Sequence, residues 1–598
     1  MATAQTRGRS HMAELLQRLR ERKLVQWALA YIAAAFALIQ VLDVVAQRFG
    51  WPDVLERLLI LALAIGFFIT LVLAWYHGER GAQNVTRTEL VILALLLTIG
   101  TGLLWRYGRM PPPGNAAPQG PTAAAAAPAV ITSETSVAVL PLANEGGDAD
   151  QQYFSDGLSE DLISALSQFD GLKVISRNSA FQFRDSKLSS DAIGRALGVA
   201  HLLEGSVRRL QDQVRVSAEL VNAADGSTLW SQHYDRAYKD LFALQDEITN
   251  AVASALKAKL LESGAAMLQS ERPPSGNLDA WNAYSRARFH AAIIDPADGR
   301  QAIEFYNQAI ALDPRYARAY AGMSLAESII GATFFSGAEQ QEAYVKARAA
   351  ADRALQLDPS MALAHAARGL LLQWQDFDWT AAESEYRRAT ELAPGDGFYS
   401  AQLGRMRGVL GHSQQAISLL RQGGVTDPRD ASVQYWLGWY LAADGQAEAA
   451  EQALRNAVTL TPGKSFLAAG LVIMQVRRGE YEAASATAQQ TPPGIWRDIA
   501  LAFAAQTGND RAAADAALQS LIAQSADGSA YQIAEVYGLR KDADNMFTWL
   551  DRAWDARDSG ISRLLTDPFI LPYRGDARFA AFCSKVGLPT ATDAKFAP

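Results

Sequence analysis

Cysteine is almost absent from this 598-residue chain, and charged residues are sparse. A single thiol, Cys583, excludes an intrachain disulfide and any cluster of thiolates around zinc or iron. Asp, Glu, Lys and Arg make up 20% of the residues, and the formal net charge is −8. Because nucleic-acid phosphates are bound by concentrated Lys and Arg, this composition argues against nucleic acid as the main partner.

Recognisable catalytic and metal-binding motifs are also missing. The seven histidines are scattered, with no pair four residues apart and no His-Glu-x-x-His. Gly463-Lys464-Ser465 resembles the end of a phosphate-binding loop, but Val458 stands where that loop requires glycine, and no strand precedes it. We interpret it as a turn between repeats. The sequence therefore predicts no catalytic, cofactor-binding or metal-binding residues and no enzymatic activity.

Two weaker patterns lie near the start of the expected soluble part. Asp156, Glu160 and Asp161 cluster where we expect a helix to begin, and acids are favoured at the positive end of a helix dipole. We interpret these acids as capping residues and not as a general acid and base. Gly146-Gly147 follows the first expected strand, where α/β folds bind ligands, so a small-molecule site there stays open.

The strongest pattern that the sequence does contain is a repeat of 34 residues between Leu363 and Pro462. Prolines close each unit one period apart, and before each proline the chain has a small residue, a large apolar residue and another small residue. Each unit also begins with a glycine. The positions are Gly369, Ala382, Tyr386, Ala389 and Pro394; Gly404, Ala416, Leu420, Gly423 and Pro428; and Gly438, Ala450, Leu454, Ala457 and Pro462.

This spacing predicts two short antiparallel helices in each unit. Small residues let the helices approach closely, and proline ends the second helix because it lacks an N–H group. The pattern resembles the tetratricopeptide repeat, whose signature positions are matched by Leu437-Gly438, Ala450, Leu454, Ala457 and Pro462. The resemblance implies an all-α superhelix, which we expect over residues 276–588 with seven to eight repeats and a C-terminal cap from Asp567-Pro568 to Leu588.

Several large or polar side chains occupy helix positions that face the concave groove in the tetratricopeptide repeat, which this pattern resembles. Aromatic and Arg side chains dominate interface energies, so they would anchor an extended or helical peptide. Packing of the aromatic residues in the core between repeats is the alternative. The candidate groove residues are Gln373, Trp374, Arg405, Tyr435 and Trp439.

Apolar runs near the N-terminus predict membrane-spanning helices, because about 20 apolar residues cross a hydrocarbon core of about 30 Å. The distribution of Lys and Arg beside them places the N-terminus in the cytoplasm and the soluble domains on the far side. We therefore expect a multi-pass protein of a bacterial inner membrane, in contact with the lipid bilayer, with periplasmic soluble domains. The expected segments are a cytoplasmic N-terminus (1–23), a three-helix anchor (24–106, with spans 24–46, 58–76 and 90–105) and a Pro/Ala linker (107–133).

Alternating strand and helix patterns over residues 134–262 predict a small α/β domain. Strands are expected over 136–142, 172–176, 201–208 and 214–221, and helices over 157–169, 191–197 and 241–261. Asp225-Gly226 indicates a hairpin turn that leads to a further strand through Trp230.

The same region is similar to the TolB-amino-terminal-like domain. The resemblance is carried by the run SVAVLPLANEGGDADQQYFSDGLSEDLISALSQFDGLKVISRNS and by LEGSVRR, VRVSAELVNAADGSTLWSQHYDR and LFALQDEI after it. In bacteria that domain is often found between a membrane segment and tetratricopeptide repeats, and in relatives it follows a winged-helix domain or a class III nucleotide cyclase. Since only 23 residues precede the first expected span, we expect no such effector domain here.

The complete fold class expected is thus three transmembrane helices, a small α/β domain and an all-α tetratricopeptide-repeat superhelix. We expect a non-enzymatic, membrane-anchored periplasmic scaffold that binds a protein or peptide through its repeat groove. The alternative is an envelope signalling receptor whose α/β domain senses a ligand and acts through a separate cyclase or transcription regulator. Homo-oligomerisation is possible in either case.

Overall fold

The structure is a computed structural model that describes residues 135–146, 151–260, 272–293, 295–335, 337–508, 510–526 and 528–595. The predicted N-terminus (1–23), membrane anchor (24–106) and linker (107–133) lie outside these residues. Within the described ranges, no helix has both the length and the apolar character needed to cross a bilayer. The predicted fold class, which began with three transmembrane helices, is therefore corrected to a small α/β domain followed by a long all-helical region.

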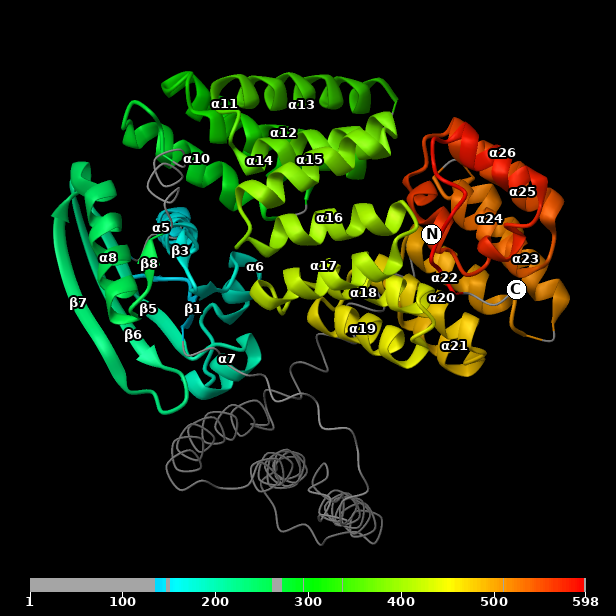
Figure 1. The fold of residues 1–598 in the computed structure, drawn as a ribbon, viewed down its shortest axis with the longest axis horizontal. Coiled ribbons are helices and arrows are strands. Elements are labelled where there is room, and N and C mark those ends of the chain that lie inside the picture. Colours follow the sequence, from blue (N-terminus) through cyan, green and yellow to red (C-terminus); the bar gives the residue numbers. More distant parts are fainter. Residues whose placement is uncertain are drawn as a thin grey trace, which may run out of the picture. The chain divides into compact units, whose positions relative to one another are not determined.

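The α/β domain is built on a mixed sheet with strand order β4-β1-β5-β6-β7, in which β2 also pairs with β5 (Figure 1). β1 runs parallel to β4 and β5, whereas β5, β6 and β7 form antiparallel pairs. The strands are β1 (Ser136–Val139), β2 (Ala143–Asn144), β3 (Phe169–Asp170), β4 (Lys173–Val174), β5 (His201–Leu210), β6 (Gln213–Asn222), β7 (Thr228–Ala237) and β8 (Lys259–Leu260), and β3 pairs with β8 in a second small sheet.

Both faces of the main sheet are covered, because successive residues of a strand point to opposite sides. Val137 and Val139 pack with α5 (Gln152–Leu166) and α8 (Leu241–Ala255) on one face. Ala138 and Leu140 pack on the other face with α7 (Ser190–Leu197) and with residues that surround α6 (Arg177–Ala180). The Asp225-Gly226 turn joins β6 to β7, and Gly226 has a positive φ of 68°.

The helical region begins at Leu278 and consists of eight consecutive helix pairs in the described residues. The pairs are α10 (Leu278–Ala291) with α11 (Pro296–Leu312), α12 (Ala317–Phe334) with α13 (Gly337–Leu357), α14 (Ala362–Leu371) with α15 (Trp379–Leu392), α16 (Gly397–Val409) with α17 (Ser413–Thr426), α18 (Ala431–Ala443) with α19 (Ala447–Leu460), α20 (Ser465–Arg478) with α21 (Tyr481–Gln490), α22 (Ile495–Ala505) with α23 (Arg511–Ser525), and α24 (Ala530–Leu539) with α25 (Ala543–Asp555). This is a tetratricopeptide-like architecture.

The small and large residues of the repeat pack against each other within each pair, as the sequence pattern predicts. A Cβ atom added to Gly438 would lie 2.6 Å from Cγ of Leu454, and one added to Gly369 would lie 3.0 Å from the ring of Tyr386. Glycine is therefore required where the large residue of the second helix crosses the first helix. In the first six pairs the second helix ends two residues before a proline, as α19 ends at Leu460 before Pro462.

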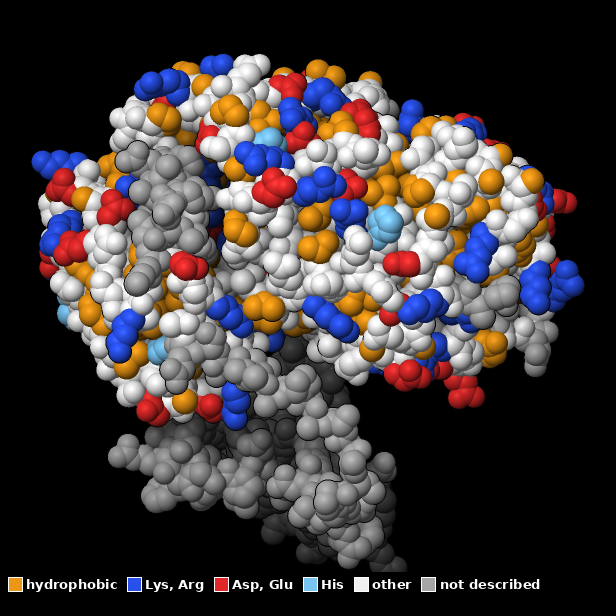
Figure 2. Space-filling view, viewed as in Figure 1, with side chains coloured by type: hydrophobic (Ala, Val, Ile, Leu, Met, Phe, Trp, Pro, Cys, Tyr) orange, Lys and Arg blue, Asp and Glu red, His pale blue; other side chains and the backbone are white. Residues whose placement is uncertain are grey.

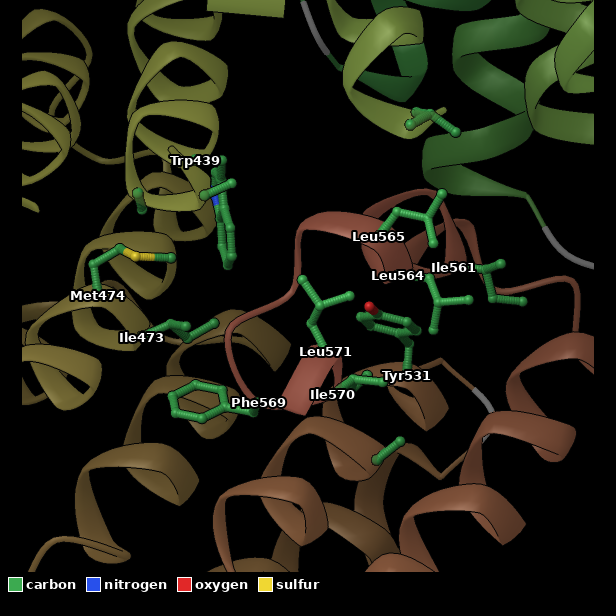
Figure 3. Close-up of a cluster of buried hydrophobic side chains, with 14 of the residues drawn as sticks. Trp439, Ile473, Met474, Tyr531, Ile561, Leu564, Leu565, Phe569, Ile570 and Leu571 are labelled. Carbon is green, nitrogen blue, oxygen red and sulfur yellow. The ribbon is translucent and has the colours of Figure 1, made fainter. Parts of the chain in front are cut away.

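The C-terminal segment does more than cover the last repeat. It contains the 3₁₀ helices η5 (Ser559–Thr566) and η6 (Leu571–Tyr573) and the helix α26 (Ala577–Lys585). Leu564, Leu565 and Leu571 are buried in one large cluster with Trp439 of α18 (Figure 3). The indole Nε1 of Trp379 on α15 donates a hydrogen bond to the backbone oxygen of Val586 at 2.8 Å. The segment therefore extends back over several earlier repeats.

The α/β domain also contacts the turn between α17 and α18, within the compact unit Val130–Pro598. The backbone N–H of Ser176 donates to the oxygen of Thr426 at 2.7 Å, and the hydroxyl of Ser179 donates to the carboxylate of Asp427. The Arg429 side chain donates to Gln182 at 2.7 Å. At its other end the domain places α5 against α10, so it spans four successive repeats.

Candidate functional site

Half-buried aromatic rings follow one another along the first helices of successive repeats. Trp436 lies on α18, Phe466 on α20 and Trp496 on α22, and all three rings are partly accessible. The ring centroids of Phe466 and Trp496 are 6.4 Å apart, and buried Tyr435 connects Phe466 to Trp436 with centroid distances of 5.4 and 5.3 Å. We call Arg405, Trp436, Phe466 and Trp496 the aromatic row.

Arg405 of α16 forms the N-terminal end of this row. Its guanidinium carbon lies 4.9 Å from the ring centroid of Trp436, which is a cation–π geometry. Its Nη1 donates to Oε1 of Gln402 at 2.9 Å, and its backbone oxygen accepts from the hydroxyl of Tyr440 at 3.0 Å. The bond to Gln402 and the ring contact hold the guanidinium beside the indole, so the pair combines a charge with an aromatic ring.

Tyr435 and Trp439, two of the predicted groove residues, are buried. Trp439 has no exposed surface, and the guanidinium of Arg563 from the C-terminal segment lies 4.6 Å from its ring centroid. Burial raises the pKa of the Tyr435 hydroxyl, which Arg563 partly offsets. The structure therefore places both side chains in the packing between repeats, which is the alternative that the sequence left open.

The remaining predicted residues, Gln373 and Trp374, lie in a π-helical turn, η4 (Leu372–Asp376), one repeat before Arg405. Gln373 is buried, and its Oε1 accepts a hydrogen bond from the hydroxyl of Tyr386 at 3.0 Å. Trp374 is half-buried. The structure thus brings Arg405, Tyr435 and Trp439 near one another, and Gln373 bonds to Tyr386, which also lies close enough to Arg405 to interact electrostatically with it.

Sequence reasoning missed the three accessible rings, although a signal for them exists. Trp436, Phe466 and Trp496 are 30 residues apart in the chain, which is close to the length of one repeat. An aromatic residue at a constant interval recurs on the same face of each successive first helix. The predicted residue Trp439 lies less than one helical turn from Trp436 but faces the C-terminal segment.

The capping interpretation of the acids on α5 is wrong. The helix begins at Gln152, before these acids, so none of them lies in its first turn and none caps its end. Asp156 is buried and accepts from Nη2 of Arg184 at 2.7 and 2.8 Å. Glu160 is also buried and forms ion pairs with Arg177 and Arg288. The acids therefore hold the α/β domain together internally and dock it on α10.

Two other sequence motifs have plain structural roles or fall outside the described residues. Gly463 lies in the turn between α19 and α20 with a φ of 103°, so the Gly463-Lys464-Ser465 motif is a turn between repeats. Gly146 is described, but Gly147 is not. Among the described residues, no group of three His, Cys, Asp or Glu side chains is arranged to hold a metal ion.

Comparisons with known proteins match two parts of the chain. Residues 133–251 match a family profile described as the second domain of HilA/YgeH-like transcriptional regulators. A protein of Rhizobium meliloti (strain 1021), named putative adenylate cyclase 3, is 33% identical over 264 residues. The match covers 44% of this chain and 44% of that protein, so the chain spans less than half of this relative. The assignment to a TolB-amino-terminal-like domain stays a prediction.

Solved structures that resemble the chain include two helical-repeat proteins at low similarity. YrrB, described as a tetratricopeptide-repeat protein with an unusual peptide-binding site, is 17% identical with a TM-score of 0.24. The match covers 36% of this chain and 97% of YrrB. PilF of Pseudomonas aeruginosa is 15% identical with a TM-score of 0.25, and the match covers 45% of this chain and 97% of PilF. The architecture described above rests on the helix pairs of this chain and not on these scores.

Proposed function

We propose that this protein is a non-enzymatic scaffold that binds a peptide segment of a partner protein along the aromatic row. The observation that carries the proposal is the continuous line of ring contacts from Arg405 to Trp496 across four successive first helices. Trp, Tyr and Arg side chains are enriched among residues that dominate binding energy. A line of partly exposed rings on a fixed backbone is therefore suited to bind a peptide.

The length of the row sets the length of the segment that it accommodates. Packed helices lie about 8–10 Å apart, so three steps between four neighbouring helices span about 24–30 Å. An extended chain covers about 3.3 Å per residue, so the row matches a peptide of about seven to nine residues. On the one face of the molecule that Figure 2 shows, Lys and Arg side chains are interspersed with Asp and Glu.

The test is selection of peptides from a displayed random library on the immobilised full chain. We expect the peptides selected on the wild-type protein to bind the variants Trp496→Ala and Arg405→Ala at least tenfold more weakly. Tyr481→Ala is the matched control, because Tyr481 is an aromatic residue of α21 that is 50% exposed and lies on the second helix of its pair.

Equal loss in the row variants and in the Tyr481→Ala control, or no loss in either, would refute the proposal. Trp439→Ala does not serve as a binding test, because Trp439 is fully buried under Arg563 and its removal acts on stability. Circular dichroism and thermal unfolding of each variant separate lost binding from lost folding.

A second candidate function is that of a regulatory module in a signalling system. It is favoured by the two sequence matches, because one is named for transcriptional regulators and the other for a putative adenylate cyclase. These are the two output classes that the resemblance of the α/β domain implied. In this case the chain recruits or controls a separate effector through the aromatic row.

Two measurements distinguish these functions. Co-purification of a cyclase or transcription regulator with the full chain, lost on Trp496→Ala, supports the signalling role. Formation of cyclic AMP from ATP and magnesium by the purified full chain alone would instead show an enzyme and refute the non-enzymatic proposal.

A further inference from the structure

One edge of the main sheet is long and open. The strand order ends on one side at β4, which has two residues, and on the other side at β7, which has ten. Among the described residues β7 pairs with β6 alone, and it forms the outer edge of the sheet in Figure 1. An exposed edge strand presents N–H and C=O groups that pair with a strand of another chain. β7 is therefore a candidate interaction surface.

The alternation of hydrogen bonds identifies the backbone groups at this edge. In antiparallel strands, residues that exchange bonds with the neighbouring strand alternate with residues whose N–H and C=O groups point away from it. The N–H of Tyr238, directly after β7, donates to the oxygen of Asp212 at 2.7 Å. From Trp230 onward the register with β6 is regular, so the even-numbered residues bond to β6. The residues whose backbone groups face the open edge are Ser231, His233, Asp235 and Ala237.

β7 lacks the features that usually protect a sheet edge. Short strands, Pro, Lys and bulges prevent pairing in most natural proteins. β7 contains neither Pro nor Lys, and its register irregularity lies at Leu229, before the regular part. Its two charged side chains are paired within the chain, Asp235 with Arg215 at 2.7 Å and Arg236 with Glu247 of α8 at 2.9 Å. A second strand therefore approaches β7 without burying an unpaired charge of this strand.

The side chains of β7 favour a second copy of the same strand in antiparallel orientation. If two copies paired parallel and in register, Asp235 would lie opposite Asp235 and Arg236 opposite Arg236. Like charges directly opposite each other destabilise a sheet. In an antiparallel pair with Tyr234 at the two-fold axis, His233 instead lies opposite Asp235 of the second copy, and Gln232 lies opposite its Arg236.

The same residues select the position of the two-fold axis. With the axis at Tyr234, residues 231–237 of the two strands pair, and the irregular Leu229 stays outside. The backbone groups that face the edge then meet in four hydrogen-bonded residue pairs, which carry about eight bonds. With the axis at His233, the two His233 side chains would lie opposite each other, and the contact with Asp235 would be lost.

We propose that this protein forms a two-fold symmetric dimer in which the β7 strands of two copies pair antiparallel, with Tyr234 at the axis. The two main sheets then join into one continuous sheet. Two-fold dimers are the commonest homo-oligomers, and both copies contribute the same surface to the interface. The partner that fits this edge is thus a second copy of the chain.

The first test is sedimentation velocity of the full chain at micromolar concentration. We expect the wild type to be dimeric and His233→Pro to be monomeric. Proline is tolerated on an edge strand where the N–H faces outward, as it does at His233, so this variant keeps the bonds to β6. Circular dichroism and thermal unfolding check that it folds.

Two further variants of the same residue test the contact with Asp235 of the second copy. His233→Arg places a cation there and should stay dimeric, whereas His233→Asp opposes two carboxylates and should dissociate at least fivefold more readily. A monomeric wild type or a dimeric, folded His233→Pro would overturn the proposal. A monomeric wild type that captures an extended peptide, with capture lost in His233→Pro, would assign the edge to a different chain and also overturn it.

Disulfide cross-linking of Gln232→Cys/Arg236→Cys tests the register. In the proposed dimer each new thiol lies opposite the other thiol of the second copy, with Cβ atoms about 4.5–5.5 Å apart. Within one chain the two positions are about 13 Å apart along the strand, too far for a disulfide. The native Cys583 is buried. We expect oxidation to link two copies of the double variant and not of either single variant; no link in the double variant, or a link in Gln232→Cys alone, would overturn this pairing.

Discussion

Replacing Arg563 by methionine is expected to destabilise the C-terminal half of the helical region severely. Nη2 of Arg563 lies 2.7 Å from Oε2 of Glu535, and the two side chains are 6% and 0% exposed. The guanidinium carbon also lies 4.6 and 5.2 Å from the ring centroids of Trp439 and Tyr531. The variant Arg563→Met therefore leaves Glu535 buried beside Asp567 without a cation.

The expected cost is about 3–5 kcal/mol, which is typical of removing one partner of a buried ion pair. The double variant Glu535→Leu/Arg563→Met should recover most of this loss, because apolar residues of similar volume often replace a buried pair without penalty. The comparison separates the penalty of an unpaired carboxylate from the loss of the contacts that Arg563 makes with the two rings.

The cost should also depend on pH, with a defined sign. Burial raises the pKa of Glu535 well above its usual value, and Arg563 opposes this rise. Without Arg563 the pKa of Glu535 in the folded state rises further. The stability that protonated Glu535 contributes is therefore complete below the pKa of about 4.3 that it has in the unfolded chain, and it is lost as pH rises through the folded-state pKa. Arg563→Met should therefore be least harmful near pH 5 and most harmful near pH 8.

Urea unfolding followed by tryptophan fluorescence measures these differences. A loss below about 1 kcal/mol at pH 8 would refute the reasoning, because it would mean that the buried carboxylate needs no cation. A double variant as unstable as the single one would refute it in another way, since the lost ring contacts would then account for the whole effect.

Three further changes have expected outcomes. Burial and the charge of Asp430 raise the pKa of Asp427 to about 6, so the stability that the protonated Asp427 contributes is complete below about pH 3.9 and is lost as pH rises through 6. Asp427→Asn should make the free energy of unfolding less dependent on pH and raise it at pH 8 by up to about 3 kcal/mol, as measured by urea unfolding at pH 5 and 8. Gly408→Ala should lower the melting temperature by a loss of about 1–3 kcal/mol because its Cβ overlaps the ring of Tyr440, whereas the control Gly424→Ala, which has room for a methyl group, should not. Asp593→Ala should cost about 1 kcal/mol in the same measurement, because this carboxylate accepts from the first backbone N–H groups of α17.

The periodic parts of the fold were predictable because their determinants are local. Pro394, Pro428 and Pro462 predicted the ends of three second helices, and each helix ends two residues before its proline. Alternation along β6 and the Asp225-Gly226 turn likewise predicted the strand and hairpin that the structure contains. Each of these signals lies within a few residues of the element that it specifies.

Contacts between distant segments were not predictable from periodicity. Whether Trp436 or Trp439 is accessible depends on Arg563, which is more than one hundred residues away in the chain. The acids of α5 were misinterpreted because the helix begins several residues before the expected start at Gly157. Their spacing of four residues from Asp156 to Glu160 places both on one helical face, which indicates a common side for their arginine partners.

The predicted membrane spans and linker fall on residues that the structure does not describe, and the described residues form no helix able to cross a bilayer. The periplasmic location of the soluble domains stays a prediction. Fusions of alkaline phosphatase after Arg109 and at the C-terminus measure it directly, because the enzyme is active only outside the cytoplasm.

Contacts of the α/β domain with both α10 and the Asp427 turn limit how the stacked hairpins can move. In an array where each helix pair touches only the pairs next to it, small rotations between pairs add up, so the array can stretch and bend and its pitch can vary. Here a folded block joins the first pair to the fourth, and Val586 and Asp593 connect the chain end to α15 and α17. The pitch of these repeats cannot change unless one of these joints opens, so stretching by an external force should break the array in one step and not gradually.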